Sequence, residues 1–249
     1  MTFKDHFSKQ AGDYSKFRPS YPAELYAYLD TLVAEHACAW DCGTGNGQAA
    51  IALAGYFDSV IATDASQQQI DNATPHERVS YRVATAEHST LDDHSVDLIT
   101  VAQALHWFDL DKFYAEVRRV AKPQAAIAVW VYELMQFDDP AVQAVLDYCY
   151  RDLVGSYWPP ERIHCETRYQ QLPFPFKEFD TPDFSVQYHW TKDAFLGYLS
   201  TWSAVQRYIS DLNSDPISTL IQPRLDAIWS SEEQKTLKLI FSMRAGNVF

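Results

Sequence analysis

The sequence has few of the features that mark cysteine-rich, membrane or nucleic-acid-binding proteins. Its four cysteines form no C-x-x-C pair, so the sequence indicates neither a zinc site nor a disulfide framework. Lys and Arg number 20 against 33 Asp and Glu, and the formal net charge of −13 argues against a nucleic-acid or acidic-membrane partner. No apolar run approaches the roughly 18 residues of a transmembrane helix, and residues 1–10 lack the apolar segment of a signal peptide. We therefore expect a cytoplasmic protein without a metal or membrane partner.

Glycine is also scarce. Only eight of the 249 residues are glycine, yet three of them alternate at Gly43, Gly45 and Gly47. Residues 37–42 predict a buried strand before this stretch, and residues 48–54 predict a helix after it, with apolar side chains at helical spacing. Glycines between a strand and a helix let the backbone turn tightly and approach a ligand closely. The N–H groups at the start of the helix favour an anionic group there.

Asp64 ends the next predicted strand, residues 59–63, beside the glycine stretch. In a doubly wound sheet a carboxylate at this position can accept two hydrogen bonds from a ribose diol, which favours a nucleoside-containing cofactor. The alternative is a glycine-rich turn followed by a solvated Asp. The spacing also argues against a dinucleotide, because G-x-G-x-x-G would place a glycine where Gln48 stands.

The stretch Asp41-Cys42-Gly43-Thr44-Gly45-Asn46-Gly47 follows the pattern D-x-G-x-G-x-G and resembles the class I S-adenosyl-L-methionine (SAM) dependent methyltransferases. The resemblance implies SAM as the cofactor and an α/β, Rossmann-like, mainly parallel seven-stranded sheet with helices on both faces. It also implies that the cofactor is bound by the glycine stretch and the following strand end, through Asp41, Gly43, Gly45, Gly47, Asp64 and Ala65.

A third strand end carries a further match. Residues 79–83 alternate in the manner of a strand and lead to Ala84-Thr85-Ala86-Glu87. In the methyltransferases a G-D-A-E-like segment at this strand end contacts the adenine, so the resemblance implies cofactor contacts at Ala86 and Glu87. Thr85 departs from that pattern, because Asp is common there, and leaves the contact with the adenine amino group open. The alternative for Glu87 is a solvated surface side chain.

The fourth predicted strand, residues 95–101, leads to Gln103-Ala104-Leu105-His106-Trp107-Phe108, at the edge where ligands bind in open α/β sheets. This segment resembles the trans-aconitate methyltransferase-like group (methyltransferase type 11). The resemblance places Gln103 near the methionine part of SAM, and His106 and Trp107 near its methyl. His106 is the candidate catalytic residue, either as a general base or as a hydrogen-bond partner of a substrate carboxylate. The alternative is a core aromatic pair beside a helix-capping histidine.

The N-terminal residues resemble the leader of the same group. In such relatives the leader folds over the cofactor, which implies that Tyr14 and Arg18 close over SAM and that Arg18 reaches its carboxylate. The alternative is an arm that packs its aromatic side chains on the domain. The matching positions are Phe7, Ala11, Tyr14, Arg18-Pro19 and Tyr21-Pro22.

The regular alternation of predicted strands and helices stops after the fifth predicted strand, residues 125–131. We expect residues 1–131 to form the leader and the SAM-binding core, and residues 132–249 to form a helical lid insertion plus the last two core strands, within one structural unit. The expected strands and helices of this second part lie at 183–190 and 235–243, and at 138–154, 192–211 and 217–229.

Aromatic residues of the second part are candidate walls of an acceptor pocket. Tyr132, Trp158 and Trp202 are the predicted substrate-binding residues beside His106 and Trp107, and Tyr198 to Ser203 also resembles the trans-aconitate group. The alternative for each is packing inside the insertion. A cation for an acidic acceptor could come from one of four arginines, Arg151, Arg162, Arg168 and Arg207.

The resemblance implies methyl transfer from SAM to a small-molecule acceptor by direct in-line displacement, which mainly requires positioning. The resemblance of the His-Trp-Phe and lid segments favours a carboxylate oxygen as the acceptor, and such an oxygen is ionised at neutral pH and needs no general base. The alternatives are methylation of an amine, a phenol or a carbon, and a SAM-binding regulator without turnover.

Overall fold

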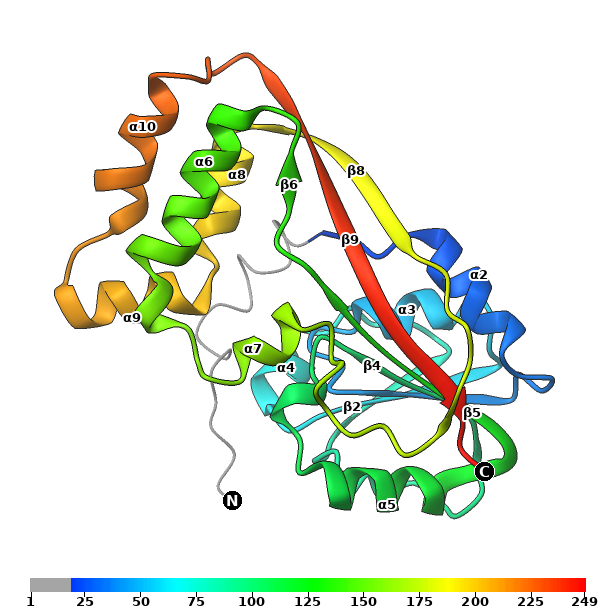
Figure 1. Ribbon diagram of the computed structural model, residues 1–249. Helices are drawn as coiled ribbons and strands as arrows, with labels where there is room; N and C mark the ends of the chain where they lie inside the picture. The colour runs from blue at the N-terminus through cyan, green and yellow to red at the C-terminus, as the bar shows by residue number, and fades with distance from the viewer. Residues whose placement is uncertain (1–18) are drawn as a thin grey trace.

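The central sheet contains nine strands in the order β3-β2-β1-β4-β5-β9-β6, with β7 and β8 also paired to β9 (Figure 1). It is described by a computed structural model that covers residues 19–249. β1 to β5 are parallel to one another, whereas β9 is antiparallel to all of its partners. The strands are β1 (Cys38–Cys42), β2 (Ser59–Asp64), β3 (Val79–Val83), β4 (Val96–Ala102), β5 (Ala121–Tyr132), β6 (Gln136–Phe137), β7 (Lys177–Glu178), β8 (Phe184–Thr191) and β9 (Gln234–Asn247).

The predicted fold class is confirmed, because the sheet is mostly parallel and Rossmann-like, with helices packed on it. All seven expected strands are present, and the two additional strands are β6 and β7. Each of these is only two residues long and pairs with β9. A two-residue strand leaves no alternation that could be detected in a sequence.

Helices cover both faces of the parallel part of the sheet. These helices are α2 (Ala23–Thr31), α3 (Gln48–Leu53), α4 (Gln67–Asp71) and α5 (Leu110–Val120). Successive side chains of β5 point to opposite faces, as a strand requires. Ala128 and Trp130 enter the hydrophobic core that includes α2 and α3, whereas Val129 and Val131 enter the core that includes α5. The parallel strands are therefore buried on both sides, which explains their continuous apolar sequences.

The remaining helices form the lid. Four of them, α6, α8, α9 and α10, gather at the end of the sheet where β9 begins (Figure 1). None of the helices between residues 19 and 249 is both long enough and apolar enough to cross a membrane. The lid elements are α6 (Pro140–Asp147), η3 (Tyr148–Leu153), η4 (Gly155–Tyr157), α7 (Arg162–Glu166), α8 (Lys192–Ser200), α9 (Ser203–Leu212), η5 (Ile217–Ile221) and α10 (Gln222–Asp226).

The expected single helix over residues 192–211 is wrong, because two helices, α8 and α9, occupy this stretch. The break falls at Thr201 and Trp202. Trp202 has an extended backbone, with φ −68° and ψ 132°, and stands at the N-cap of α9. Its indole is buried and packs on Tyr198 and Tyr150, at 5.8 and 5.7 Å between ring centroids. Packing of this large side chain therefore overrides the helical periodicity of the sequence.

Aromatic packing joins the lid helices to the sheet. Phe195 of α8 lies against Phe137 and Trp229, at 4.9 and 6.0 Å between ring centroids. One turn earlier, the Lys192 ammonium donates a hydrogen bond to the Trp229 carbonyl and pairs with Asp226. Phe195 and Trp229 belong to the same hydrophobic core as α2 and α3. We therefore propose that the two parts of the chain, residues 1–131 and 132–249, fold as one unit.

Replacing Phe195 by alanine should lower the free energy of unfolding by about 3–5 kcal/mol, because removal of a buried aromatic side chain leaves a cavity. Tryptophan fluorescence and circular dichroism should report one common transition during urea unfolding, since one core joins both parts. Leu212→Ala is the control, because Leu212 is 52% exposed, and it should change stability by less than about 0.5 kcal/mol. Two separate transitions would contradict a single unit.

Candidate active site

The loop after β1 has three backbone positions that favour glycine. Gly43, Gly45 and Gly47 have φ angles of 71°, 57° and 88°, which residues with a side chain rarely adopt. A Cβ on Gly43 would lie 2.6 Å from the Ala104 Cβ, and a Cβ on Gly47 would lie 2.1 Å from the Tyr81 hydroxyl oxygen. Gly43 and Gly47 therefore allow the loop to lie directly against Ala104, just after β4, and against Tyr81 in the middle of β3.

The carboxylate of Asp64 joins this loop to the end of β2. Its Oδ2 accepts a hydrogen bond from the Gly45 N–H and its Oδ1 accepts one from the Ser66 N–H, both at 2.9 Å. The neighbouring Ala65 is partly exposed between β2 and α4. The two bonds orient the carboxylate at the edge of the sheet, where a ribose diol binds in doubly wound folds.

Asp41, near the end of β1, is fully buried. Its carboxylate accepts hydrogen bonds from the hydroxyls of Thr44 and Thr100, at 2.5 and 2.8 Å. Burial raises the pKa of Asp41 to about 6, and the two hydroxyl bonds offset part of that rise. A buried carboxyl group beside the glycine loop suits a cationic group of a bound cofactor, which would favour its ionised form.

The segment after β3 is tied to α5. Ala86 is buried in the core that includes this helix. Glu87 accepts a hydrogen bond from the backbone N–H of Asp109, the N-cap residue of α5, at 2.9 Å. Glu87 is thus bound to the protein rather than simply solvated, and it positions the loop between β4 and α5. A contact between Glu87 and the cofactor stays a prediction.

Gln103 has an unusual backbone at the end of β4. Its φ is 61°, and its N–H donates to the Trp130 carbonyl of β5 at 2.9 Å. Its side-chain Nε2 is buried and has no hydrogen-bond partner in the described part of the chain. A buried donor without an acceptor is rare and points to a ligand. Together with the glycine loop, Asp41 and Asp64, this donor fits the amino-acid and ribose groups of SAM.

His106 and Trp107 lie together in the short turn η2 (Leu105–Trp107), with ring centroids 4.6 Å apart. The Nδ1 of His106 is 3.0 Å from the Tyr169 hydroxyl, and the Cys165 thiol lies 3.7 and 3.8 Å from the two ring nitrogens. Burial, followed by the nearby charges of Arg162 and His164, lowers the pKa of His106 to about 3. The imidazole is therefore neutral and weakly basic at physiological pH, which favours positioning over general-base catalysis.

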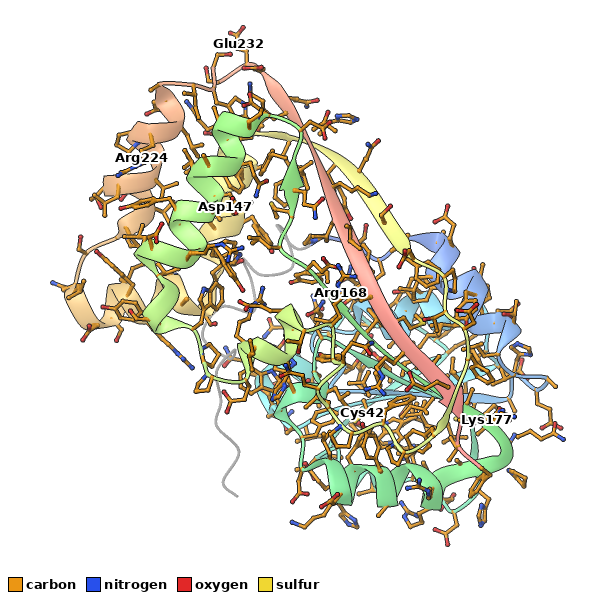
Figure 2. All side chains as sticks on the ribbon, viewed as in Figure 1. Cys42, Asp147, Arg168, Lys177, Arg224 and Glu232 are labelled. Atoms are coloured by element: carbon orange, nitrogen blue, oxygen red, sulfur yellow. The ribbon has the colours of Figure 1, made fainter. Side chains whose placement is uncertain are left out.

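A pocket of about 410 Å³ lies between the end of β5 and the lid. It has the size of a small-molecule site. Figure 2 shows one of its lining residues, Asp147, on the lid helix α6. Cys165 brings the wall of the pocket into contact with His106. The pocket is lined by Tyr132, Glu133, Leu134, Met135, Gln136, Gln143, Asp147, Tyr150, Arg151, Arg162, Cys165 and Glu166.

Of the three predicted aromatic walls, only Tyr132 lines this pocket. Trp158 and Trp202 lie one layer behind it and contact Tyr150, with ring centroids 5.1 and 5.7 Å away. The Trp158 indole N–H also donates to the Tyr150 carbonyl at 3.1 Å. These two tryptophans support the pocket wall rather than form its surface, so the packing alternative holds for them.

The structure distinguishes the four candidate arginines. Arg168, labelled in Figure 2, is exposed and pairs with Glu133 at 3.0 Å. Arg207 donates to the Tyr157 carbonyl, and Arg151 is an exposed residue of the pocket lining.

Arg162 is partly buried and lies over the Trp158 ring at 4.9 Å. Its Nε donates to the Tyr150 hydroxyl at 2.9 Å. Among residues 19–249 it has no carboxylate within ion-pair distance. It is therefore a partly buried cation of the pocket wall whose charge no direct ion pair within residues 19–249 neutralises.

Sequence reasoning missed Tyr169, Tyr150 and Cys165. Tyr169 and Cys165 contact His106 although they lie about sixty residues away in the sequence. No local sequence pattern predicts such a contact. The predicted Tyr14 and Arg18 lie outside the described residues, so their closure over the cofactor stays a prediction. A second hollow, of about 510 Å³, is lined by Val33, Pro123 and Asn247 at the opposite end of the parallel strands, away from the glycine loop.

Comparisons with known proteins agree with this arrangement. A family model described as a methyltransferase domain matches residues 40–129. A Dictyostelium discoideum protein named as a methyltransferase is 35% identical over 238 residues, which cover 94% of this chain and 90% of the relative. A Mycobacterium tuberculosis methyltransferase is 35% identical over 127 residues, about half of each protein. The solved structure of a type II methyltransferase from Anaeromyxobacter dehalogenans has a TM-score of 0.86 and 44% identity, covering 94% of this chain and 99% of that chain.

The fold and the glycine-rich edge of the sheet are those of a Rossmann-like domain that binds a nucleoside-containing cofactor. With relatives of this similarity over nearly the whole chain, the chain belongs to the class I SAM-dependent methyltransferases, and SAM is its methyl donor. Its membership of the trans-aconitate methyltransferase-like group stays a prediction.

Asp64→Ala should weaken SAM binding by about 1–3 kcal/mol, because paired hydrogen bonds to the ribose are lost. Isothermal titration calorimetry measures the change. Asp58→Ala is the matched control, since Asp58 is an exposed acid just before the opposite end of β2, and it should leave the affinity unchanged. Equal affinities for the wild type and Asp64→Ala would show that the ribose contact is wrongly assigned.

The raised pKa of Asp41 predicts a pH effect on stability. Between an unfolded pKa near 3.8 and a folded pKa near 6, the folded protein keeps a proton that the unfolded chain has lost. The contribution of Asp41 to stability therefore falls as pH rises through this range, by about 3 kcal/mol in total. Asp41→Asn cannot ionise, so its stability relative to wild type should rise with pH in urea titrations. Parallel profiles for the two proteins would contradict the assignment.

Proposed function

We propose that the protein transfers the methyl group of SAM to a carboxylate oxygen of a small organic acid bound between β5 and the lid. The observation that carries this proposal is Arg162, a pocket-lining cation without a carboxylate partner in the described part of the chain. A guanidinium offers several N–H donors in one plane and binds carboxylates through paired hydrogen bonds. An otherwise acidic protein would need such a local cation to attract an anionic acceptor.

We propose that the cofactor is held by the residues at the carboxyl ends of the first four strands. In this assignment Asp64 binds the ribose, and Asp41 and Gln103 bind the amino-acid part. The glycine loop, Ala65, Ala86 and Glu87 complete the site, with Tyr14 and Arg18 of the leader. When bound, SAM supplies an electrophilic methyl carbon next to a positively charged sulfur.

The neutral state of His106 supports a carboxylate as the acceptor. An ionised carboxylate forms a bond to the methyl carbon as the carbon–sulfur bond breaks, and no proton has to be removed. The products are a methyl ester and S-adenosylhomocysteine. A phenol or a protonated amine would first have to lose a proton, for which an imidazole with a pKa near 3 is a poor acceptor.

A second candidate, N-methylation of an amine, is favoured by one observation. Three carboxylates, Glu133, Asp147 and Glu166, line the same pocket as Arg162, and a carboxylate can bind an ammonium group or accept its proton. However, Glu133 is paired with Arg168 and Glu166 accepts a hydrogen bond from the Tyr150 hydroxyl at 2.6 Å. The two candidates differ in their products, because only the ester is hydrolysed by alkali to methanol.

Release of S-adenosylhomocysteine should be measured with a panel of small carboxylic acids, amines and phenols. We expect turnover on an acid, with an alkali-labile product. Turnover on amines alone would favour the second candidate. SAM binding without release on any compound would favour the non-catalytic regulator.

Arg162→Gln should raise the KM for the acid about 10- to 100-fold, because a charged hydrogen-bond partner is lost from the pocket. The dissociation constant of SAM should stay the same, since Arg162 belongs to the acceptor pocket. Arg224→Gln is the matched control: Arg224 stacks on Tyr148 on the exposed side of α10 and should leave the KM unchanged. An unchanged KM in Arg162→Gln would remove Arg162 from the acceptor site.

A further inference from the structure

Tyr169 is held rigidly beside His106. Its side chain is buried, and its backbone is in the left-handed region, with a φ of 59°. The backbone N–H of Tyr169 donates to the His164 carbonyl of α7 at 2.8 Å, and its carbonyl accepts from an Arg244 guanidinium nitrogen at 3.0 Å. A backbone strained at a residue with a side chain is typical of functional sites. The phenol is therefore fixed between α7 and β9 before any ligand binds.

The surroundings of the Tyr169 hydroxyl determine where its proton points. Burial raises the pKa of this phenol well above its usual range, so the group is neutral and keeps its proton. Within residues 19–249, the acceptor that the hydroxyl proton meets is His106 Nδ1, at 3.0 Å.

The alternative arrangement has an energetic penalty. If His106 carried its proton on Nδ1, that N–H would donate to the phenol oxygen, and the buried phenol proton would be left without an acceptor among residues 19–249. Such an arrangement is disfavoured, because a buried hydroxyl without an acceptor loses the hydrogen bond that it makes in water. His106 Nδ1 is thus the acceptor, and in a neutral imidazole the remaining proton must be on Nε2.

We infer that Tyr169 is a positioning residue that holds His106 in its Nε2–H tautomer, so that the imidazole meets the acceptor as a hydrogen-bond donor rather than as a base. The Cys165 thiol lies 3.8 Å from Nε2 and is only a weak acceptor. A carboxylate oxygen would accept this N–H far better. This last use of the N–H rests on the proposed function, whereas the tautomer does not.

The tautomer is measured by long-range ¹H–¹⁵N NMR on the whole ¹⁵N-labelled protein without an acceptor. We expect His106 to show a protonated Nε2 and an unprotonated Nδ1. In Tyr169→Phe, which lacks only the hydroxyl, the spectrum should shift to a mixture of tautomers. Tyr114→Phe is the matched control, because it removes another buried phenol hydroxyl, one that donates to the Pro173 carbonyl, and it should leave His106 unchanged. A wild-type His106 protonated at Nδ1, or an unchanged tautomer in Tyr169→Phe, would overturn the inference.

The role of the N–H is tested in the acid panel with two amide variants. The amide nitrogen of His106→Gln can take the place of Nε2, whereas that of His106→Asn lies nearer to Nδ1. We expect His106→Gln to retain at least tenfold more turnover than His106→Asn, with equal SAM affinity. Equal inactivity of both variants would favour a base. If no acid is turned over, the proposed function fails, while the tautomer measurement still decides the role of Tyr169.

Discussion

The antiparallel pairing of β9 with β5 is the constraint that places the lid over the edge of the sheet. The second half of β9 pairs with β5 from Tyr132↔Phe241 to Ala126↔Asn247, which anchors it in the core. Its first half extends past the parallel strands and pairs with β8 and β6, from which α8 and α6 begin. β9 therefore belongs both to the core sheet and to the base of the lid. Beside β9, the end of β5 meets η3 and α7, and the pocket forms there.

Burial shifts the pKa values of two titratable side chains of the edge, Asp41 and His106, in opposite directions. It raises the pKa of Asp41 and lowers that of His106, because a low-dielectric site disfavours the charged form of each. Arg162, a guanidinium, keeps its charge under the same conditions. The site thus combines a carboxyl group that a cation can ionise, a neutral imidazole and a permanently charged guanidinium. Such a set binds and orients charged groups better than it moves protons.

The parts of the site that could be predicted from the sequence are those determined by local chain geometry. Gly43, Gly45 and Gly47 have positive φ angles, which favour glycine, and Asp64 and Gln103 stand where their strands end, so their places at this edge could be predicted from spacing. The contact between His106 and Tyr169 spans 63 residues and depends on the path of the lid, which carries no periodic signal. The helix break at Trp202 was missed for a related reason, because tertiary packing outweighed local propensity.

The tryptophans predicted as pocket walls pack around Arg162 and its hydrogen-bond partner Tyr150. The guanidinium lies over the Trp158 ring, and its Nε is committed to the Tyr150 hydroxyl, which in turn donates to Glu166. Trp202 packs on Tyr150 from behind. A guanidinium held in this way has its orientation set before an acceptor arrives, so less side-chain entropy is lost on binding. The chain from Arg162 through Tyr150 to Glu166 also brings a negative charge close to the cation without neutralising it in a direct ion pair. In the proposed function the lid aromatics would thus contribute to acceptor binding by fixing a cation, whereas Tyr132 at the end of β5 and Tyr150 of η3 line the pocket itself.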